Sequence, residues 1–265
     1  MADLPEALLD LARALAASAA ELLVDGLSRR RAEVATKSTI TDMVTEIDRA
    51  SERLIVDGIL AQRPDDAIVG EEGTAVSGTS GVEWLVDPLD GTTNYLYGHA
   101  GFAVSIAARA GGETLAGVVH DPLHGDVFTA ARGHGAARNG TAIHVPDHAD
   151  LATALVATGF AYDATTRARQ AQVLVHVLPR VRDIRRMGAA AVDLCSVAAG
   201  RVNAYYERGL GPWDLAAGAL VAEEAGAVVG SLDGPASAGG VVIAAPPSLF
   251  RAVRDLLEAA GAGEA

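Results

Sequence analysis

The sequence lacks several residues and segments that mark special classes of protein. A single cysteine, Cys195, excludes an intrachain disulfide framework and a zinc site built from several cysteines. Aromatic residues make up 4% of the chain, so the core must consist mainly of Ala, Val, Leu and Ile. No stretch reaches the ~18 uncharged apolar residues of a membrane span, and the N-terminus lacks the layout of a signal peptide. The sequence therefore predicts a cytoplasmic protein.

Basic residues are also scarce. The 21 Lys and Arg stand against 34 Asp and Glu, which gives a formal net charge of −13. This balance disfavours a uniformly basic surface for nucleic acid, and no basic amphipathic stretch indicates binding to a membrane surface. We therefore expect neither a nucleic acid nor a membrane as a partner.

The remaining composition, 50% hydrophobic and 21% charged, is that of an ordinary globular protein. Hydrophobic spacing predicts two long helices, one ending near residue 30 and one over about residues 42–60, followed by an antiparallel meander of strands. Beyond residue 150, strands and helices alternate. The sequence thus predicts a mixed α+β and α/β chain with an N-terminal half at 1–148 and a C-terminal half at 149–265.

The densest chemical signal is the segment DPLDGTTN at residues 87–94. Asp87 and Asp90 follow a predicted strand, and Gly91 and Thr92 begin a predicted helix whose free N–H groups favour phosphate. Two facing carboxylates repel each other unless a cation lies between them. Oxygen ligands without His or Cys favour Mg²⁺. Taken alone, the segment also fits an Asp-Gly turn on a buried strand.

Two further acidic positions strengthen this interpretation. Glu71 and Glu72 follow another predicted strand, and Asp214 lies in the first turn of a predicted helix. Each also has an ordinary explanation, either a solvated loop or the charge that favours a helix start. Together they supply the four carboxylates of a two-metal phosphoryl-transfer site, in which water attacks phosphorus and no protein nucleophile is required.

In order and spacing, these segments resemble the signatures of the inositol monophosphatase family, which are Mg²⁺-dependent, lithium-sensitive phosphatases. The resemblance extends over residues 37–226 and includes DMVTEID at 42–48 and the region from Gly188 to Glu207. It implies a layered αβαβα sandwich of the inositol monophosphatase and fructose-1,6-bisphosphatase type. It also implies a bacterial-type cytoplasmic hydrolase that is usually a homodimer, with its N-terminal half carrying most of the metal ligands.

The resemblance also implies the roles of individual residues in binding two or three Mg²⁺ ions. The first ion would be held by Glu71, Asp87, the Leu89 carbonyl and the Thr92 hydroxyl, and the second by Asp87, Asp90 and Asp214. Glu71 would also lie near a weaker third position. Thr92, hydrogen-bonded to Asp48, would help to deprotonate the attacking water, so that Glu71, Thr92 and Asp48 form the catalytic set.

The implied substrate pocket combines backbone and carboxylate groups. The N–H groups of Gly91 and Thr92 would hold the phosphate, and the ring hydroxyls would face Ala190 and Glu207, with Asp214 beside them. Asp90 would also contact the substrate. For Glu207, a solvated position at the end of a strand over residues 203–206 is the alternative. Lys37 and Asp42 would support the site from outside, although a surface ion pair fits them equally well. Ala189 stands where the family typically has Ser or Thr.

The reaction that this resemblance implies is hydrolysis of myo-inositol monophosphate to inositol and phosphate. The segment GTTN at residues 91–94 looks more like the inositol type than like related phosphatases. Those relatives act on small phosphomonoesters such as histidinol phosphate, fructose 1,6-bisphosphate or a 3′-phosphorylated nucleotide, and such a substrate is the alternative. A family member with an additional, non-catalytic binding role is a further alternative.

Overall fold

Two β-sheets organise the computed structural model, which describes residues 4–33 and 40–264. The first has eight strands in the order β2-β1-β3-β4-β5-β6-β7-β8, antiparallel except for the pair β1 and β3. The second has five strands in the order β10-β9-β11-β13-β12, of which β10, β9 and β11 are parallel. The strands are β1 (Ala67–Gly70), β2 (Ala75–Val76), β3 (Val82–Asp90), β4 (Ala103–Ala110), β5 (Glu113–Asp121), β6 (Asp126–Ala131), β7 (Gly135–Arg138), β8 (Thr141–Ile143), β9 (Leu155–Thr158), β10 (Asp183–Arg185), β11 (Ala204–Arg208), β12 (Val228–Gly230) and β13 (Val241–Ala245).

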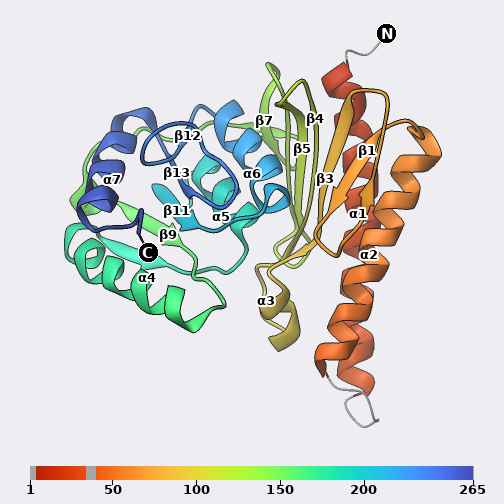
Figure 1. Cartoon of the computed structure of the whole chain (residues 1–265), viewed down its shortest axis with the longest axis horizontal. Coiled ribbons are helices and arrows are strands. Elements are labelled where there is room, and N and C mark those ends of the chain that lie inside the picture. Colours follow the sequence, from red (N-terminus) through yellow and green to blue (C-terminus); the bar gives the residue numbers. More distant parts are fainter. Residues whose placement is uncertain (1–3, 34–39, 265) are drawn as a thin grey trace.

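Helices cover both faces of each sheet. The α-helices are α1 (Leu4–Glu33), α2 (Ile40–Gln62), α3 (Thr92–Tyr97), α4 (Ala164–Val177), α5 (Ala190–Ala198), α6 (Pro212–Glu224) and α7 (Pro247–Ala259). From right to left in Figure 1 the layers are α1 with α2, the first sheet, α5 with α6, the second sheet, and α4 with α7. This is the layered αβαβα sandwich that the resemblance implied, and the prediction of the fold is confirmed.

The central helix layer is packed closely because its residues are small. A Cβ atom on Gly117 of β5 would lie 2.9 Å from the Cα atom of Ala217 in α6. Likewise, a Cβ atom on Gly218 would lie 2.9 Å from Leu194 Cβ in α5. The layer therefore brings backbones together at a distance that larger side chains would prevent, which explains how a chain poor in aromatic residues fills its core.

The outer helix α2 has a buried face that changes character along its length. Towards its C-terminal end this face is apolar, with Ile55 and Ile59 fully buried against the first sheet. One to two turns earlier the buried side chains are polar, namely Asp48, Ser51 and Glu52. Polar groups survive burial only where they find partners, so this part of α2 must face polar atoms of the sheet.

Two strands are longer than the sequence predicts, and both differences affect the site. The predicted strand over residues 83–86 continues through Asp90, with a shift of register between Asp87 and Asp90. The predicted strand over residues 203–206 continues through Arg208, because Glu207 and Arg208 pair with β13. Pro, Asp and Glu are unfavourable inside isolated strands, whereas pairing to a distant strand overrides that local preference.

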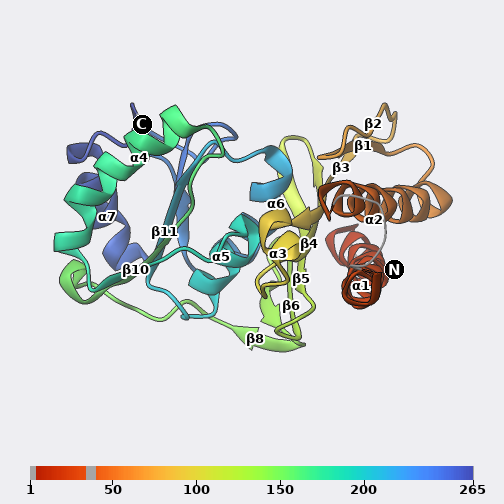
Figure 2. The same cartoon turned by 90° about the horizontal axis from the view of Figure 1, so that it is seen from below.

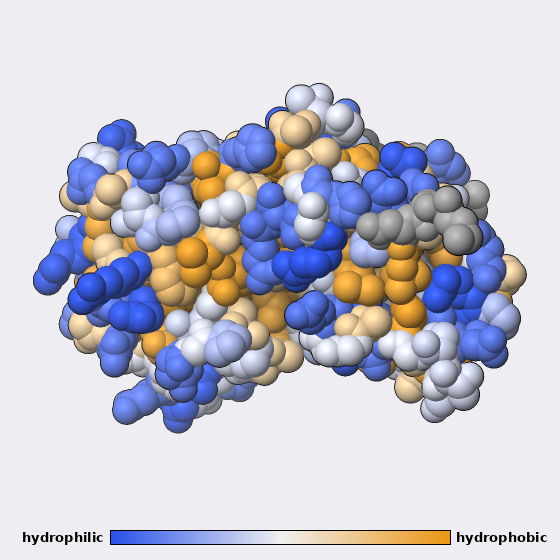
Figure 3. Space-filling view, turned by 90° about the horizontal axis from the view of Figure 1, so that it is seen from above, coloured by the Kyte–Doolittle hydropathy of each residue, from blue (hydrophilic) through white to orange (hydrophobic). Residues whose placement is uncertain are grey.

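The outer surface shows no extended apolar face in the view of Figure 3. Apolar residues on this face occur in patches that hydrophilic residues border, and a waist separates the two halves of the molecule. Within the described ranges, no helix combines the length and the apolar character needed to cross a membrane.

Candidate active site

A cleft of about 320 Å³ lies where β1, β3 and β11 approach the first turns of α3, α5 and α6. Figure 2 shows these three helices beside one another at the centre of the molecule. The cleft brings together nine of the residues that the sequence singled out. They are Glu71, Asp87, Leu89, Asp90, Gly91, Thr92, Ala190, Glu207 and Asp214.

Asp87 is positioned by an irregularity in strand β3. The register of β3 against β4 shifts between Asp87 and Asp90, as in a β-bulge, which turns successive side chains towards one side. The Asp87 side chain is 1% exposed, and its Oδ1 accepts a hydrogen bond of 3.0 Å from the backbone N–H of Leu89. The bulge thus places two carboxylates, three residues apart, in the same cleft.

Gly91 makes the turn from β3 into α3. Its φ of 88° lies in the left-handed region, and a Cβ atom there would be 2.9 Å from the Gly101 carbonyl oxygen, so glycine is required on both counts. Thr92 begins the helix, and its hydroxyl donates a 3.2 Å hydrogen bond to the Leu89 carbonyl. The hydrogen bond that the resemblance implied between Thr92 and Asp48 stays a prediction.

Asp90 joins the first sheet to helix α5. Its two carboxylate oxygens accept hydrogen bonds of 3.2 Å from the Ala190 N–H and 2.8 Å from the Ala191 N–H. Ala189, the N-cap residue of α5, offers no side-chain cap. The carboxylate of Asp90 therefore satisfies the N–H groups that a Ser or Thr cap would serve in part.

Glu71 follows β1 in a turn that α2 holds from behind. Glu52 of α2 accepts hydrogen bonds from the N–H groups of Glu72, at 2.9 Å, and Thr74, at 3.2 Å. A Cβ atom on Gly70 would lie 2.2 Å from Glu52 Oε2, so the glycine gives the carboxylate its space. In the neighbouring loop, the hydroxyl of Ser51 donates to the Pro88 carbonyl at 3.1 Å. The polar face of α2 thus supports both loops that carry acidic side chains.

Asp214 reaches the cleft from the second half of the chain. It lies in the first turn of α6, and its Oδ2 accepts a 2.7 Å hydrogen bond from the Gly211 N–H. The preceding residue is fixed to the first sheet, because the Ser105 hydroxyl donates to the Trp213 carbonyl at 3.1 Å. The start of α6 therefore holds Asp214 against the carboxylates of β3.

Glu207 lies on strand β11, across the cleft from the first sheet, and not beyond the end of a strand as the sequence predicted. Its Oε2 accepts a 2.7 Å hydrogen bond from the Tyr205 hydroxyl. Arg186 also lines the cleft, and its positive charge partly offsets the rise that burial causes in the pKa of Glu207.

The four carboxylates next to one another are strongly perturbed. Burial raises the pKa of Asp87 well above its usual range, and the charges of Glu71, Asp90 and Asp214 raise it further. Burial and then Asp214 raise the pKa of Asp90 in the same way. Glu71 and Asp214 also have raised pKa values, chiefly through burial, although hydrogen bonds with Asp87 moderate both. Asp87, the most buried of these four acids, is thus the one whose charged form is opposed both by burial and by three neighbouring carboxylates.

The donor set fits a hard divalent cation. Four carboxylates and the Leu89 carbonyl line one wall, and oxygen donors of this kind suit Mg²⁺. Among the described residues, no three His, Cys, Asp or Glu side chains have a geometry that would hold a metal as they stand. Burial and mutual repulsion raise the pKa of Asp87 and Asp90, and a bound cation would offset this repulsion.

Comparison with known proteins identifies the family. Residues 4–261 match the sequence model of the inositol monophosphatase family. The chain belongs to this family. Inositol-1-monophosphatase of Mycobacterium bovis is 44% identical over 264 residues, covering 92% of this chain and 91% of the relative. A protein named Nus factor SuhB, from Pasteurella multocida, is 41% identical over 255 residues, covering 95% and 96% of the two chains. Family membership supports a phosphatase and, as is general in this family, one that depends on a metal.

Solved structures of inositol monophosphatase family members have the same fold. Mycobacterium tuberculosis SuhB superposes with a TM-score of 0.84 at 43% identity, over 97% of each chain. The inositol monophosphatase of Anabaena (Nostoc) gives a TM-score of 0.84 at 35% identity, over 96% of each chain. The similarity covers both halves of the chain and therefore the whole cleft.

Three predicted residues of this inositol monophosphatase family member lie outside the cleft lining. Asp48 is buried behind Glu71 and Glu72, and burial together with those charges raises its pKa to about 8. Its Oδ1 atom has no hydrogen-bond partner. Lys37 lies outside the described residues. Asp42 belongs to α2, but its side chain lies outside the described part of the chain.

Two residues for which the sequence predicted no role lie in or beside the cleft of this phosphatase, Tyr162 in its lining and Asn94 behind it. Tyr162 covers one side, with its hydroxyl 3.4 Å from the Thr93 hydroxyl, although the two residues come from different halves of the chain. The Asn94 amide donates to the carbonyls of Gly101, at 2.6 Å, and Met187, at 2.7 Å, which joins α3 to the loop before α5. No local motif marks Tyr162, whereas Asn94 lies within the segment 87–94 and could have been assigned this role.

Proposed function

We propose that this phosphatase hydrolyses monophosphate esters of polyols, with myo-inositol monophosphate as its substrate and Mg²⁺ as its metal. The observation that carries the proposal is the arrangement of the cleft. Glu71, Asp87, Asp90 and Asp214 crowd one wall, and the Glu207 carboxylate faces them from the other sheet. The four crowded carboxylates suit cations that bind phosphate, and the Glu207 carboxylate suits the hydroxyl groups of a leaving alcohol.

Each side of the cleft would handle one part of the ester. The backbone N–H groups of Gly91 and Thr92 would hold the phosphate oxygens, as donors fixed in advance of the reaction. Glu207, with the backbone at Ala190, would receive the hydroxyl groups of the alcohol. These polar groups suit a small, hydroxylated phosphomonoester.

The acids and the Thr92 hydroxyl would bind the metal and orient the attacking water. Mg²⁺ held by Glu71, Asp87, Asp90, Asp214 and the Leu89 carbonyl would supply activation of water and neutralisation of the charge on the departing oxygen. The Thr92 hydroxyl uses its hydrogen on the Leu89 carbonyl, which leaves its oxygen lone pairs to accept a hydrogen bond from the attacking water. Two hydrogen bonds from N–H groups of α5 would hold the Asp90 carboxylate in a fixed orientation during the reaction.

The experiment that tests the proposal is a phosphate-release assay with and without Mg²⁺. Its substrates are myo-inositol 1-phosphate, histidinol phosphate, fructose 1,6-bisphosphate and a 3′-phosphorylated nucleotide. We expect the highest kcat/KM for inositol 1-phosphate and no turnover in EDTA. A higher kcat/KM for another substrate would assign the cleft to that ester, and turnover in EDTA would contradict the metal assignment.

Cytoplasmic location, the homodimer, lithium sensitivity and a binding role beyond catalysis stay predictions.

The role of Glu207 gives a more specific prediction. Hydrogen bonds to charged groups contribute about 1.5–3 kcal/mol each, so Glu207→Ala should lower kcat/KM for inositol 1-phosphate about tenfold or more. The loss for p-nitrophenyl phosphate, which has no ring hydroxyls, should be much smaller. The activity profile against Mg²⁺ concentration should keep its midpoint. Equal fractional losses for the two substrates would show that Glu207 acts through the fold or the acidic wall.

A further inference from the structure

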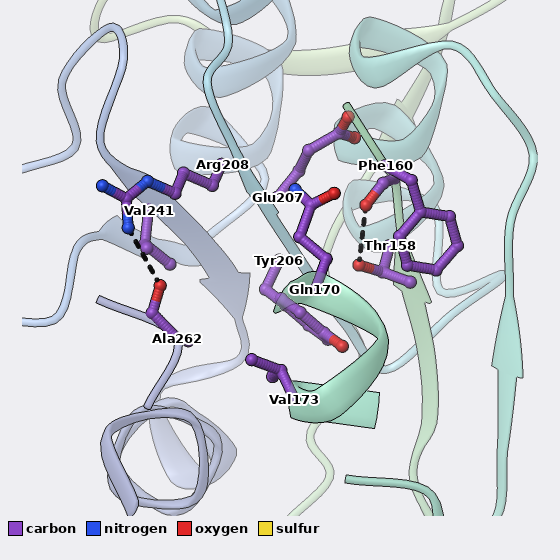
Figure 4. A pocket seen from close by; sticks show the side chains of 10 residues that line it. Thr158, Phe160, Gln170, Val173, Tyr206, Glu207, Arg208, Val241 and Ala262 are labelled. Atoms are coloured by element: carbon purple, nitrogen blue, oxygen red, sulfur yellow. Dashed lines mark hydrogen bonds between the residues drawn. The ribbon is translucent and has the colours of Figure 1, made fainter. Parts of the chain in front are cut away.

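Strand β11 presents alternate residues to two different compartments. Tyr205 packs against Ala190 and Leu194 of α5, on the side of the active-site cleft. Tyr206 packs against Val173 on the opposite side, towards α4. Figure 4 shows Tyr206 and Glu207 leaving the strand in opposite directions, with Tyr206 turned towards Gln170 and Val173. Both residues line the small cavity there, but of the two only Glu207 also lines the active-site cleft. Because side chains alternate along a strand, Tyr205 and Glu207 share the cleft side.

The Tyr205 hydroxyl is committed to Glu207. Tyr205 is fully buried, and its hydroxyl donates a 2.7 Å hydrogen bond to Oε2 of Glu207. Burial raises the pKa of Tyr205 well above its usual range, so the phenol keeps its proton and remains a donor. A phenol has one hydrogen to donate, and this hydrogen bond uses it. One carboxylate oxygen of Glu207 is thereby fixed, which leaves Oε1 for another donor.

Gly159 provides the space in which this carboxylate lies. In the parallel register of β9 and β11, Tyr205 pairs with Ala157 and Tyr206 with Thr158, which places Gly159 beside Glu207. A Cβ atom on Gly159 would lie 2.1 Å from Oε1 and 2.0 Å from Oε2 of Glu207. The φ of Gly159 is not positive, so this position needs glycine for space and not for backbone conformation.

The surrounding charges make such fixation necessary. Asp90 and Asp214 lie across the cleft, and Asp193 of α5 is buried near Glu207 and Tyr205 with its Oδ1 atom unpartnered. Arg186 is the cation that acts on Glu207. Like charges in a partly buried site repel strongly, so a freely rotating Glu207 would turn away from the acids and towards solvent or Arg186.

We propose that Tyr205 and Gly159 are positioning residues that orient Glu207 and thereby determine the selectivity of the cleft for esters of polyols. Tyr205 holds Oε2, Gly159 leaves room for the carboxylate, and Oε1 accepts hydrogen bonds from hydroxyl groups of the leaving alcohol. This inference rests on the proposed function and adds two residues that do not touch the substrate themselves.

The experiment compares Tyr205→Phe with Tyr206→Phe, a matched change at the next residue on the opposite side of the same strand. The measured quantity is the ratio of kcat/KM for inositol 1-phosphate to kcat/KM for p-nitrophenyl phosphate. We expect Tyr205→Phe to lower this ratio about tenfold, mainly through KM for inositol 1-phosphate. Tyr206→Phe should leave the ratio unchanged. Equal ratios in Tyr205→Phe and wild type would overturn the inference.

Two further variants separate orientation from folding. Gly159→Ala, which pushes the carboxylate out of its place, should lower the same ratio while thermal melts show a folded protein. In a Glu207→Ala background, Tyr205→Phe should cause no additional loss of selectivity, because the two residues act as one unit. An additional loss of the same size would show that Tyr205 acts independently of Glu207, against the inference.

The failure of this inference differs from the failure of the proposed function. If Glu207→Ala leaves the substrate ratio at the wild-type value, the substrate role of Glu207 itself is wrong. If Glu207→Ala lowers the ratio while Tyr205→Phe and Gly159→Ala do not, the proposed function stands and the positioning role of Tyr205 and Gly159 is wrong.

Discussion

At the scale of single residues, Asp87 stands out among the acids of the cleft. It is 1% exposed, whereas Asp90 is 7% exposed and Glu71 lies at the open side. It also interacts with both Glu71 and Asp214, which come from different halves of the chain. A carboxylate in the middle of such a group can bridge two cations or, without them, share protons with both neighbours.

This position leads to a prediction for Asp87→Asn. The amide carries no charge, so the variant should lose more activity than the ~10–100-fold typical of residues that only support a metal ligand. The measurement is phosphate release at saturating Mg²⁺, with Asp255→Asn on the surface of α7 as the control. Turnover near the wild-type value in Asp87→Asn would remove Asp87 from the metal site.

At the scale of secondary structure, helix α2 connects the acidic loops with one another. Asp48, Ser51 and Glu52 have the i, i+3, i+4 spacing of one helix face. Ser51 holds the Pro88 carbonyl between Asp87 and Asp90, and Glu52 holds the turn that follows Glu71. The helix thus determines the relative position of two loops that lie on separate strands.

We predict that Glu52→Gln weakens metal binding more than it weakens turnover. The amide keeps the shape of the side chain but has one acceptor oxygen in place of two, so either the N–H of Glu72 or the N–H of Thr74 would face an NH2 group and lose its acceptor. The Mg²⁺ concentration for half-maximal activity should rise about 10–100-fold. The control is Glu46→Gln, an exposed position on the same helix. An unchanged Mg²⁺ midpoint in Glu52→Gln would show that the turn holds its shape without this contact.

At the scale of the whole molecule, the active site lies where the two sheets meet through the central helices. Asp90 of the first sheet accepts hydrogen bonds from N–H groups of α5, and the Ser105 hydroxyl donates a hydrogen bond to the Trp213 carbonyl at the start of α6. Each half contributes acids to the same small volume, so folding concentrates negative charge there. The stability of the metal-free protein should therefore respond to both pH and Mg²⁺.

The pH dependence follows from Asp48. Its pKa is about 8 in the folded protein and near 3.8 when exposed, so between these values folding takes up a proton. Because the folded state binds this additional proton, the free energy of unfolding falls as pH rises through that window, by up to about 1.4 kcal/mol per pH unit. Urea melts in EDTA from pH 5 to 8 should show this decline, and Asp48→Asn should make it shallower. A stability that rises with pH would contradict the direction.

Mg²⁺ should reverse the effect of the crowded acids. At ~100 times its dissociation constant, a ligand that binds only the folded state stabilises it by about 2.7 kcal/mol per site. At pH 7.5 the melting temperature should therefore rise with Mg²⁺ concentration, and it should be lowest in EDTA without added metal. The Asp87→Asn variant provides the comparison, since its melting temperature should depend much less on Mg²⁺. Coincident melting curves for the wild-type protein with and without Mg²⁺ would argue against the metal site.

The family and the layered fold could be predicted from the sequence through its resemblance to known phosphatases, and the acidic residues that line the cleft could be predicted as metal ligands from their motifs. Periodic apolar residues predict α1 and α2, and Gly111 with Gly112 predicts the hairpin of β4 and β5, because helix periods and tight turns depend on neighbouring residues. Asp87 and Asp90 could be recognised for the same reason, since they lie three residues apart, whereas Glu71 and Asp214 lie in separate segments that only the resemblance to the family connects with them.

How these residues are held depends on contacts between distant parts of the chain. The bulge at Asp87 and the extension of β11 through Glu207 and Arg208 both depend on pairing with distant strands, which local preference does not encode. Gly159 directly follows β9, and the sequence does not show why glycine is needed there. The reason is the pairing of β9 with β11, which brings the Glu207 carboxylate to the place that a Cβ atom would occupy. Spacing along the chain specifies which groups can bind a metal, whereas the pairing of distant strands specifies where each carboxylate points.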